Sequence, residues 1–60
     1  MEKTKVKGFI CVTLFEKTEK YISIDGIDSF EDYNISTLSE DYEVLETAEQ
    51  IAQLINEARG

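Results

Sequence analysis

Apolar side chains occupy both faces of the first predicted strand, which spans residues 5–15. On a period of two, one face carries Val6, Gly8, Ile10, Val12 and Leu14, and the other carries Phe9, Cys11, Thr13 and Phe15. A strand with one face in water shows polar residues at alternate positions, and this segment does not. We therefore expect both faces of the strand to be covered.

Shorter segments rich in β-branched and aromatic residues follow, separated by polar breaks. They predict a strand over residues 20–24, a short strand or irregular segment around Ile27 and Phe30, and strands over residues 34–38 and 42–45. Asp25 and Gly26 mark a turn. The polar breaks at residues 16–19 and 39–41 read as hairpin loops, although they lack the Asn-Gly or Asp-Gly pair typical of two-residue turns.

The C-terminal segment has the pattern of a capped amphipathic helix over residues 47–59. Thr47 at the N-cap and Gln50 three positions later fit a capping box. Gly60 can end the helix. A helix of about three turns is marginal alone, so the apolar stripe must pack against the sheet. That stripe consists of Ala48, Ile51, Ala52, Leu54, Ile55 and Ala58, and we expect Ile51, Leu54 and Ile55 to face the first strand.

Together these elements predict an α+β fold: a small antiparallel β-sheet of three to five strands with one C-terminal amphipathic helix. We expect residues 1–60 to form a single domain. A domain of this size buries only about 60% of the surface of its unfolded chain, so its stability is marginal. The single cysteine excludes an internal disulfide, and the absence of histidine disfavours a zinc site. Oligomerisation remains as a source of stability, and we expect a homo-oligomer.

Membrane insertion and export are not expected. No apolar run approaches the roughly 20 residues that span a bilayer. The basic start of the chain is followed by a segment too short and too alternating for a signal-peptide core. A lone free thiol fits a reducing compartment, so we expect a cytoplasmic protein with no membrane association.

Groups that carry catalysis are scarce. Without histidine, the common nucleophile–base pairs are excluded. Cys11 sits in mid-strand, where a free cysteine is more often a small buried hydrophobe than a nucleophile. The glycines are isolated, and the acidic stretch from Asp25 to Asp32 does not match a calcium-binding loop. We expect no enzymatic activity, no cofactor and no metal site.

The net charge of −7 is unevenly distributed along the chain. Residues 1–20 carry five lysines and three glutamates, a net +2, whereas residues 21–60 carry ten acids and one arginine, a net −9. This disfavours direct nucleic-acid binding, which needs clustered Lys and Arg. The negative charge permits attraction to a basic partner. An acidic surface can also serve only to keep a small protein soluble. The candidate acidic surface consists of Asp25, Asp28, Glu31, Asp32, Glu40, Asp41 and Glu43.

The sheet face opposite the helix is the candidate contact surface, because one short helix covers only one face. Aromatic residues are enriched at interface centres. A second copy of the chain is one cover for this face; a sheet curled around a single core and a different protein partner are the alternatives. The candidate interface residues are Phe9, Cys11, Phe15 and Tyr21.

The order of elements resembles that of the FlbD/SwrD family of small flagellar and swarming-motility proteins and of similar small bacterial and phage proteins. The similarity extends from about Phe9 to Ala58. It rests on residues 21–24, on Ile27 and Phe30, on residues 42–45 and on residues 46–55. Members commonly end with a strand, then Glu-Ser/Thr-x-Glu-Glu-Ile/Val and a short amphipathic helix. The resemblance implies this topology and implies no catalytic residues.

Two functional hypotheses follow. The first is a non-enzymatic protein-interaction or accessory module of bacterial or phage origin that forms a homo-oligomer. The second is an acidic phage-type inhibitor that occupies the nucleic-acid site of a host protein. A small-ligand binder with its pocket at an oligomer interface stays open, since no residue argues for or against it.

Overall fold

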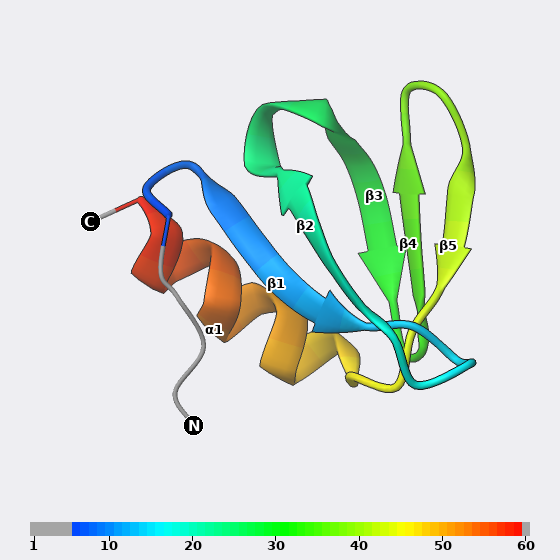
Figure 1. Cartoon of the computed structure of the whole chain (residues 1–60). Helices are drawn as coiled ribbons and strands as arrows, with labels where there is room; N and C mark the ends of the chain where they lie inside the picture. The colour runs from blue at the N-terminus through cyan, green and yellow to red at the C-terminus, as the bar shows by residue number, and fades with distance from the viewer. Residues whose placement is uncertain (1–5, 60) are drawn as a thin grey trace.

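The computed structural model describes residues 6–59. Within this range the chain forms two antiparallel sheets of five strands in total and one C-terminal helix, so the predicted α+β fold is confirmed. The Lys5 start predicted for the first strand and the Gly60 end predicted for the helix lie outside the described residues. The elements are β1 (Phe9–Thr13), β2 (Glu19–Ser23), a 3₁₀ turn (Ile24–Gly26), β3 (Ile27–Glu31), β4 (Asn34–Thr37), β5 (Asp41–Glu43) and α1 (Ala48–Ala58) (Figure 1).

β1 and β2 form an antiparallel hairpin in which Cys11 lies opposite Tyr21. The first strand is shorter than predicted, because the chain leaves β1 after Thr13 to enter the hairpin loop. In this loop Lys17 has a φ of 73°, and its N–H donates to the carbonyl oxygen of Leu14 at 2.7 Å. A left-handed residue closing a tight turn is the common alternative to the Asn-Gly pair. The loop therefore turns without the sequence signature of a two-residue hairpin.

β3, β4 and β5 form the second sheet. Its register aligns Phe30, Ile35 and Tyr42 across the three strands, on one face. Ile35 is fully buried, so this face points into the core. The segment around Ile27 and Phe30, predicted as a short strand or an irregular stretch, is strand β3, with a bulge between Ile27 and Ser29.

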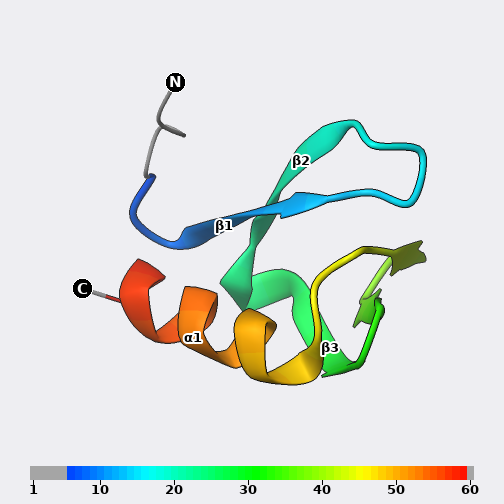
Figure 2. The same cartoon turned by 90° about the horizontal axis from the view of Figure 1, so that it is seen from below.

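An isolated bridge between Leu14 and Val44 joins the two sheets. Beside it, the N–H of Leu45 donates to the carbonyl oxygen of Thr13 at 2.9 Å. The end of β1 therefore meets the chain that follows β5, and the sheets bend around a shared interior. Figure 2 shows the β1–β2 hairpin on one side of this interior and α1 on another.

Seven buried residues from both sheets and the helix form the core. They are Ile10, Val12, Ile22, Ile35, Val44, Ile51 and Ala58. Leu54 and Ile55 pack against them, so the predicted inward face of α1 is confirmed. β1 turns only one face to this core, because Val12 is fully buried whereas Phe9 is exposed. The expectation that both faces of the first strand are covered is thus not met within one chain.

The capping box predicted at the start of α1 is confirmed. The N–H of Gln50 donates to Thr47 Oγ1 at 3.3 Å, and the N–H of Thr47 donates to Gln50 Oε1 at 2.9 Å. Asp32 adds a third contact, since its Oδ1 accepts from the N–H of Ala48 at 2.7 Å. The β3–β4 turn is thereby fixed to the helix. Across residues 6–59, no helix has the length and apolarity to cross a membrane.

Candidate interaction surfaces

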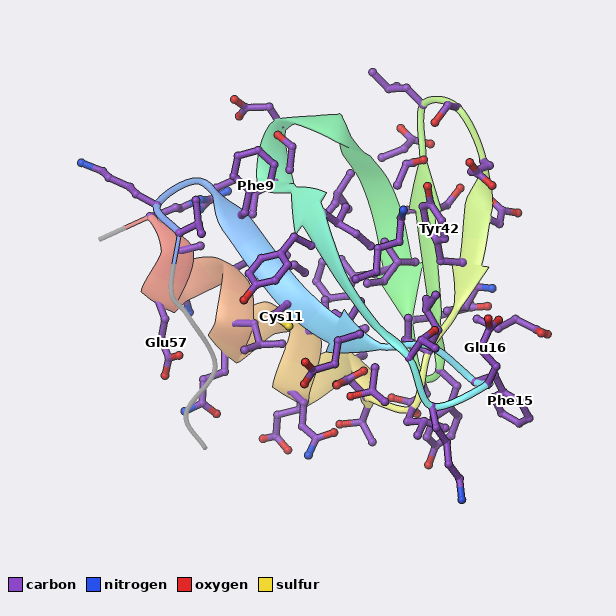
Figure 3. All side chains as sticks on the ribbon, viewed as in Figure 1. Phe9, Cys11, Phe15, Glu16, Tyr42 and Glu57 are labelled. Atoms are coloured by element: carbon purple, nitrogen blue, oxygen red, sulfur yellow. The ribbon has the colours of Figure 1, made fainter. Side chains whose placement is uncertain are left out.

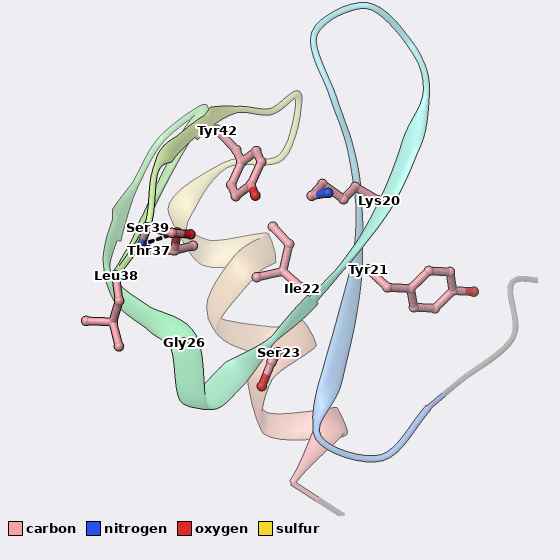
Figure 4. A pocket seen from close by; sticks show the side chains of 9 residues that line it. All are labelled: Lys20, Tyr21, Ile22, Ser23, Gly26, Thr37, Leu38, Ser39 and Tyr42. Carbon is pink, nitrogen blue, oxygen red and sulfur yellow. Dashed lines mark hydrogen bonds between the residues drawn. The ribbon is translucent and has the colours of Figure 1, made fainter.

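The exposed face of the β1–β2 hairpin brings together three of the four residues predicted for an interface. Cys11 and Tyr21 are cross-strand neighbours, and Phe9 lies diagonally from Tyr21, within reach of an aromatic side chain. Figure 3 shows Phe9 and Cys11 along β1. Phe9 and Tyr21 are each 42% exposed, and Cys11 is half-buried. Figure 4 shows Tyr21 pointing away from the interior, into which the adjacent Ile22 points. Phe9, Cys11 and Tyr21 are called the outer hairpin face below.

The turn that places Phe9 needs a glycine. The N–H of Phe9 donates to the carbonyl oxygen of Val6 at 3.0 Å, and Gly8 inside this turn has a φ of 85°. Glycine adopts that left-handed conformation without steric cost. The N–H of Gly8 donates to Ala58 at 3.0 Å, and its carbonyl oxygen accepts from Ile24 at 2.9 Å. One residue therefore fixes the start of β1 to both the helix and the end of β2.

Phe15, the fourth predicted interface residue, lies apart from this face. It is 65% exposed in the β1–β2 loop, and Figure 3 shows it at the far end of the hairpin from Phe9. Its N–H donates to the carbonyl oxygen of Glu43 at 3.1 Å, which ties the loop to β5. Leu45, which the sequence did not single out, is also exposed beside Thr13. Successive residues of an extended chain point to opposite sides, so the buried Val44 implies that Leu45 points outward. This alternation is the sequence signal that could have identified Leu45.

Three of the predicted acidic residues share the outer face of the second sheet. Glu31 and Glu43 flank Asn34 in the register, on the face opposite buried Ile35. Asp41 lies on the same face, opposite Ser36, whose Oγ donates to Asp41 Oδ1 at 2.8 Å. Neighbouring strands lie about 4.8 Å apart, so these carboxylates form a compact array. Glu31, Asp41 and Glu43 are called the acidic sheet face below.

The other four predicted acids are placed elsewhere. Asp25 is exposed in the 3₁₀ turn, Asp28 is exposed at the bulge of β3, and Asp32 caps α1. Glu40 lies in the β4–β5 turn beside Tyr42. Partial burial of the phenol, its hydrogen bond with Glu40 and the charge of that carboxylate raise the pKa of Tyr42 above its usual range. The seven acids are therefore not one continuous surface.

A groove of about 300 Å³ lies between β2 and the β4–β5 hairpin (Figure 4). Ile22, which is only 6% exposed, and Tyr42 supply apolar lining. Lys20 Nζ lies 5.2 Å from the centroid of the Tyr42 ring, within the range of a cation–π contact. Leu38 stands at its rim. The sequence left open a small-ligand pocket at an oligomer interface, whereas this groove is formed within one chain.

Within residues 6–59, no group of three or more Cys, Asp or Glu side chains is placed to hold a metal ion. The Cys11 thiol is free. No protein-family model, curated protein or solved structure matches this chain.

Proposed function

We propose that this protein is a non-enzymatic interaction module that forms a homodimer through the outer hairpin face. One observation carries the proposal: two aromatic side chains, Phe9 and Tyr21, are exposed next to half-buried Cys11 on a sheet face that α1 does not cover. Each large apolar side chain removed from water contributes roughly 1.5–3 kcal/mol. A contact at this face therefore offers a marginal domain a substantial gain in stability.

A second copy of the chain is the partner that we infer. Closed two-fold dimers are the commonest oligomers, and they use the same patch on both subunits. An exposed sheet face with an aromatic pair suits such self-contact. An interface of standard size takes about 800 Å² from each partner. That is about a fifth of the 4447 Å² that this chain exposes, so the interface would extend beyond Phe9, Cys11 and Tyr21.

We propose that this module is of bacterial or phage origin and acts in the cytoplasm as an accessory factor. The resemblance to FlbD/SwrD proteins supports that origin, and the order of strands before the capped helix is consistent with it. Phe9, Cys11 and Tyr21 carry no charge, which supports a protein partner, since interface cores are depleted in charge; Glu19 lies at the edge of the same side of the hairpin, opposite Thr13. The accessory role rests on the resemblance and the homodimer on the exposed face, so each can fail without the other.

Sedimentation equilibrium at micromolar concentration tests the dimer. We expect the wild-type chain to dimerise and Phe9→Lys to dissociate the dimer, because a lysine at the centre of an apolar contact is desolvated without a partner. Phe15→Lys is the matched control, since it makes the same change at a more exposed phenylalanine in the loop. A monomeric wild-type chain would end the proposal. Dissociation by both variants would extend the interface to the loop.

A second candidate function rests on the acidic sheet face. The register that sets Glu31 and Glu43 on either side of Asn34 supports the hypothesis of an inhibitor that mimics a row of phosphates. The immobilised chain would then retain a DNA-binding protein from bacterial lysate that duplex DNA displaces. Retention should weaken steeply with salt, because exposed charges are screened beyond about 8 Å at physiological ionic strength. Glu31→Lys with Glu43→Lys should abolish it, whereas Asp25→Lys should not.

A further inference from the structure

A pair of exposed apolar side chains lies where the chain after β1 meets the chain after β5. The bridge residues Leu14 and Val44 both pack in the core. Successive residues of an extended chain alternate sides, so Phe15 and Leu45 point outward, and they are 65% and 42% exposed. They are diagonal neighbours across the bridge, with Cα atoms about 7–8 Å apart. Phe15 and Leu45 are called the junction pair below.

The carboxylates of the acidic sheet face begin directly beside the junction pair. The N–H of Phe15 donates to the carbonyl oxygen of Glu43 at 3.1 Å, so these residues are cross-strand neighbours. The register continues from Glu43 through Asn34 to Glu31. Phe15, Glu43 and Glu31 therefore lie in one row over four adjacent segments, which is roughly 14 Å long at the usual strand spacing. Asp41 lies beside this row on the same face.

The charge around the junction pair is negative. The carboxylates of the acidic sheet face lie on one side of it, and in the loop that holds Phe15 the charges of Glu16 and Lys17 cancel. A partner that covers this surface therefore needs apolar side chains for the junction pair and positive charges for the carboxylates. An apolar partner alone would leave the carboxylates unpaired at its edge, and a basic partner alone would leave the junction pair in water.

Backbone pairing limits the form that the partner can take. The N–H of Leu45 donates to the carbonyl oxygen of Thr13 at 2.9 Å, as the N–H of Phe15 does to Glu43. The two strand edges that meet at the junction are therefore paired with each other, and an added strand needs an open edge. A helix contacts a surface through its side chains alone, because its backbone is hydrogen-bonded internally.

We propose that the junction pair and the acidic sheet face together bind a basic amphipathic helix of another protein. Apolar side chains on one stripe of that helix cover Phe15 and Leu45, and lysines or arginines beside the stripe reach Glu43 and Glu31. A helix with its side chains is about 10 Å wide, so extended basic side chains can span the row. The surface is separate from the outer hairpin face, since Phe15 lies at the far end of the hairpin from Phe9 (Figure 3).

Calorimetric titration with two synthetic peptides tests the proposal. Both have roughly 15 residues of leucine, alanine and lysine in the same proportions, and only the first has its leucines on one helical face. We expect the first peptide to bind with a micromolar dissociation constant and the second to bind at least about tenfold more weakly. Equal affinities would show that charge alone attracts the peptide, as the second candidate function requires, and would overturn the proposal. Failure of the first peptide to bind at millimolar concentration would overturn it too.

Variants at the junction pair locate the binding surface. Leu45→Ser should raise the dissociation constant of the first peptide about tenfold, as expected for the loss of one large apolar contact. Phe15→Ser repeats the test in a loop, where the fold tolerates the change. Leu38→Ser is the matched control, since Leu38 is 81% exposed at the tip of the β4–β5 hairpin, and it should leave binding unchanged. Wild-type affinity in both junction variants would refute the site.

Charge variants test the other half of the surface. Glu43→Gln should weaken binding and make it less sensitive to salt, because salt screens exposed charges. Asp25→Asn, in the exposed 3₁₀ turn, is the control and should change neither. Phe9→Lys removes the proposed homodimer contact and should leave peptide binding unchanged, so the two proposals can fail separately. Loss of peptide binding in Phe9→Lys alone would place the peptide on the outer hairpin face and overturn this inference.

Discussion

The carboxylate of Glu46 holds the backbone of Thr13, with each carboxylate oxygen 3.1 Å from the Thr13 nitrogen. The contact spans 33 positions of sequence and is partly buried. It lies next to the hydrogen bond from the N–H of Leu45 to the carbonyl oxygen of Thr13. The end of β1 is thus bound on both its donor and its acceptor side to the segment that leads into α1.

Replacing Glu46 with alanine should destabilise the fold by about 1–3 kcal/mol, because the N–H of Thr13 would lose its acceptor in a partly buried place. Glu46→Gln keeps one acceptor oxygen and should cost less. Urea denaturation followed by circular dichroism measures both. Equal losses for the two variants would show that the charge, rather than the acceptor, holds the contact.

Thr47→Ala tests the cap of α1. Loss of the Thr47 hydroxyl leaves the N–H of Gln50 without its acceptor, at a cost of about 1 kcal/mol. For a domain of this size that lowers the thermal midpoint by several degrees. Thr18→Ala, in the exposed β1–β2 loop, is the control and should change the midpoint little. An unchanged midpoint for Thr47→Ala would mean that Asp32 alone supports the first turn.

The sequence predicted the elements whose signals are local. The cap at Thr47 and Gln50 and the apolar stripe through Ile51 depend on residues within one helix, and they recur in the structure. The alternation of Phe9 with Ile10 likewise predicted which side chains of β1 share a face. Such patterns are set by backbone periodicity and need no knowledge of distant contacts.

Long-range contacts decided the rest. Asp32 was expected on an acidic surface, yet its carboxylate caps a helix sixteen positions away. Phe15 fits the period of β1, but the left-handed Lys17 takes it into a loop. The groove depends on how the two sheets bend, which is set by the bridge between Leu14 and Val44. No local sequence pattern encodes this contact between residues thirty positions apart.

The raised pKa of Tyr42 predicts a loss of stability in alkali. Partial burial and the Glu40 carboxylate raise its folded-state pKa above the unfolded value of about 10. The folded state then retains the phenol proton more strongly than the unfolded state. Its contribution to stability is complete below pH of about 10 and is lost as the pH rises through the folded pKa. Between pH 8 and pH 11, the urea midpoint should therefore fall less for Tyr42→Phe than for the wild type.

Cys11 offers a chemical test of the outer hairpin face. The thiol lies in the surface that the proposed dimer covers, so its rate of alkylation by iodoacetamide should fall as the protein concentration rises. Phe9→Lys should remove this dependence, because that variant is expected to lack the contact that covers the thiol. A wild-type rate that does not change with concentration would place Cys11 outside any self-contact.

Tyr33 occupies a backbone conformation that suits glycine. Its φ is 67°, and a bulky side chain in the left-handed region costs about 1–2 kcal/mol. The backbone is held there on both sides: the N–H of Tyr33 donates to Glu46 at 2.9 Å, and its carbonyl oxygen accepts from Val44 at 3.1 Å. The side chain itself is 54% exposed, so little packing offsets the strain.

Tyr33→Gly should therefore be more stable than Tyr33→Ala by about 1 kcal/mol, since both remove the ring but only glycine removes the Cβ that causes the strain. Thermal unfolding of the two variants measures the difference without a correction for lost ring contacts. If the alanine variant matched the glycine variant, the turn would have relaxed to another conformation. In that case the hydrogen bonds to Glu46 and Val44 should be lost, and amide exchange at Tyr33 and Val44 would become faster than in the wild type.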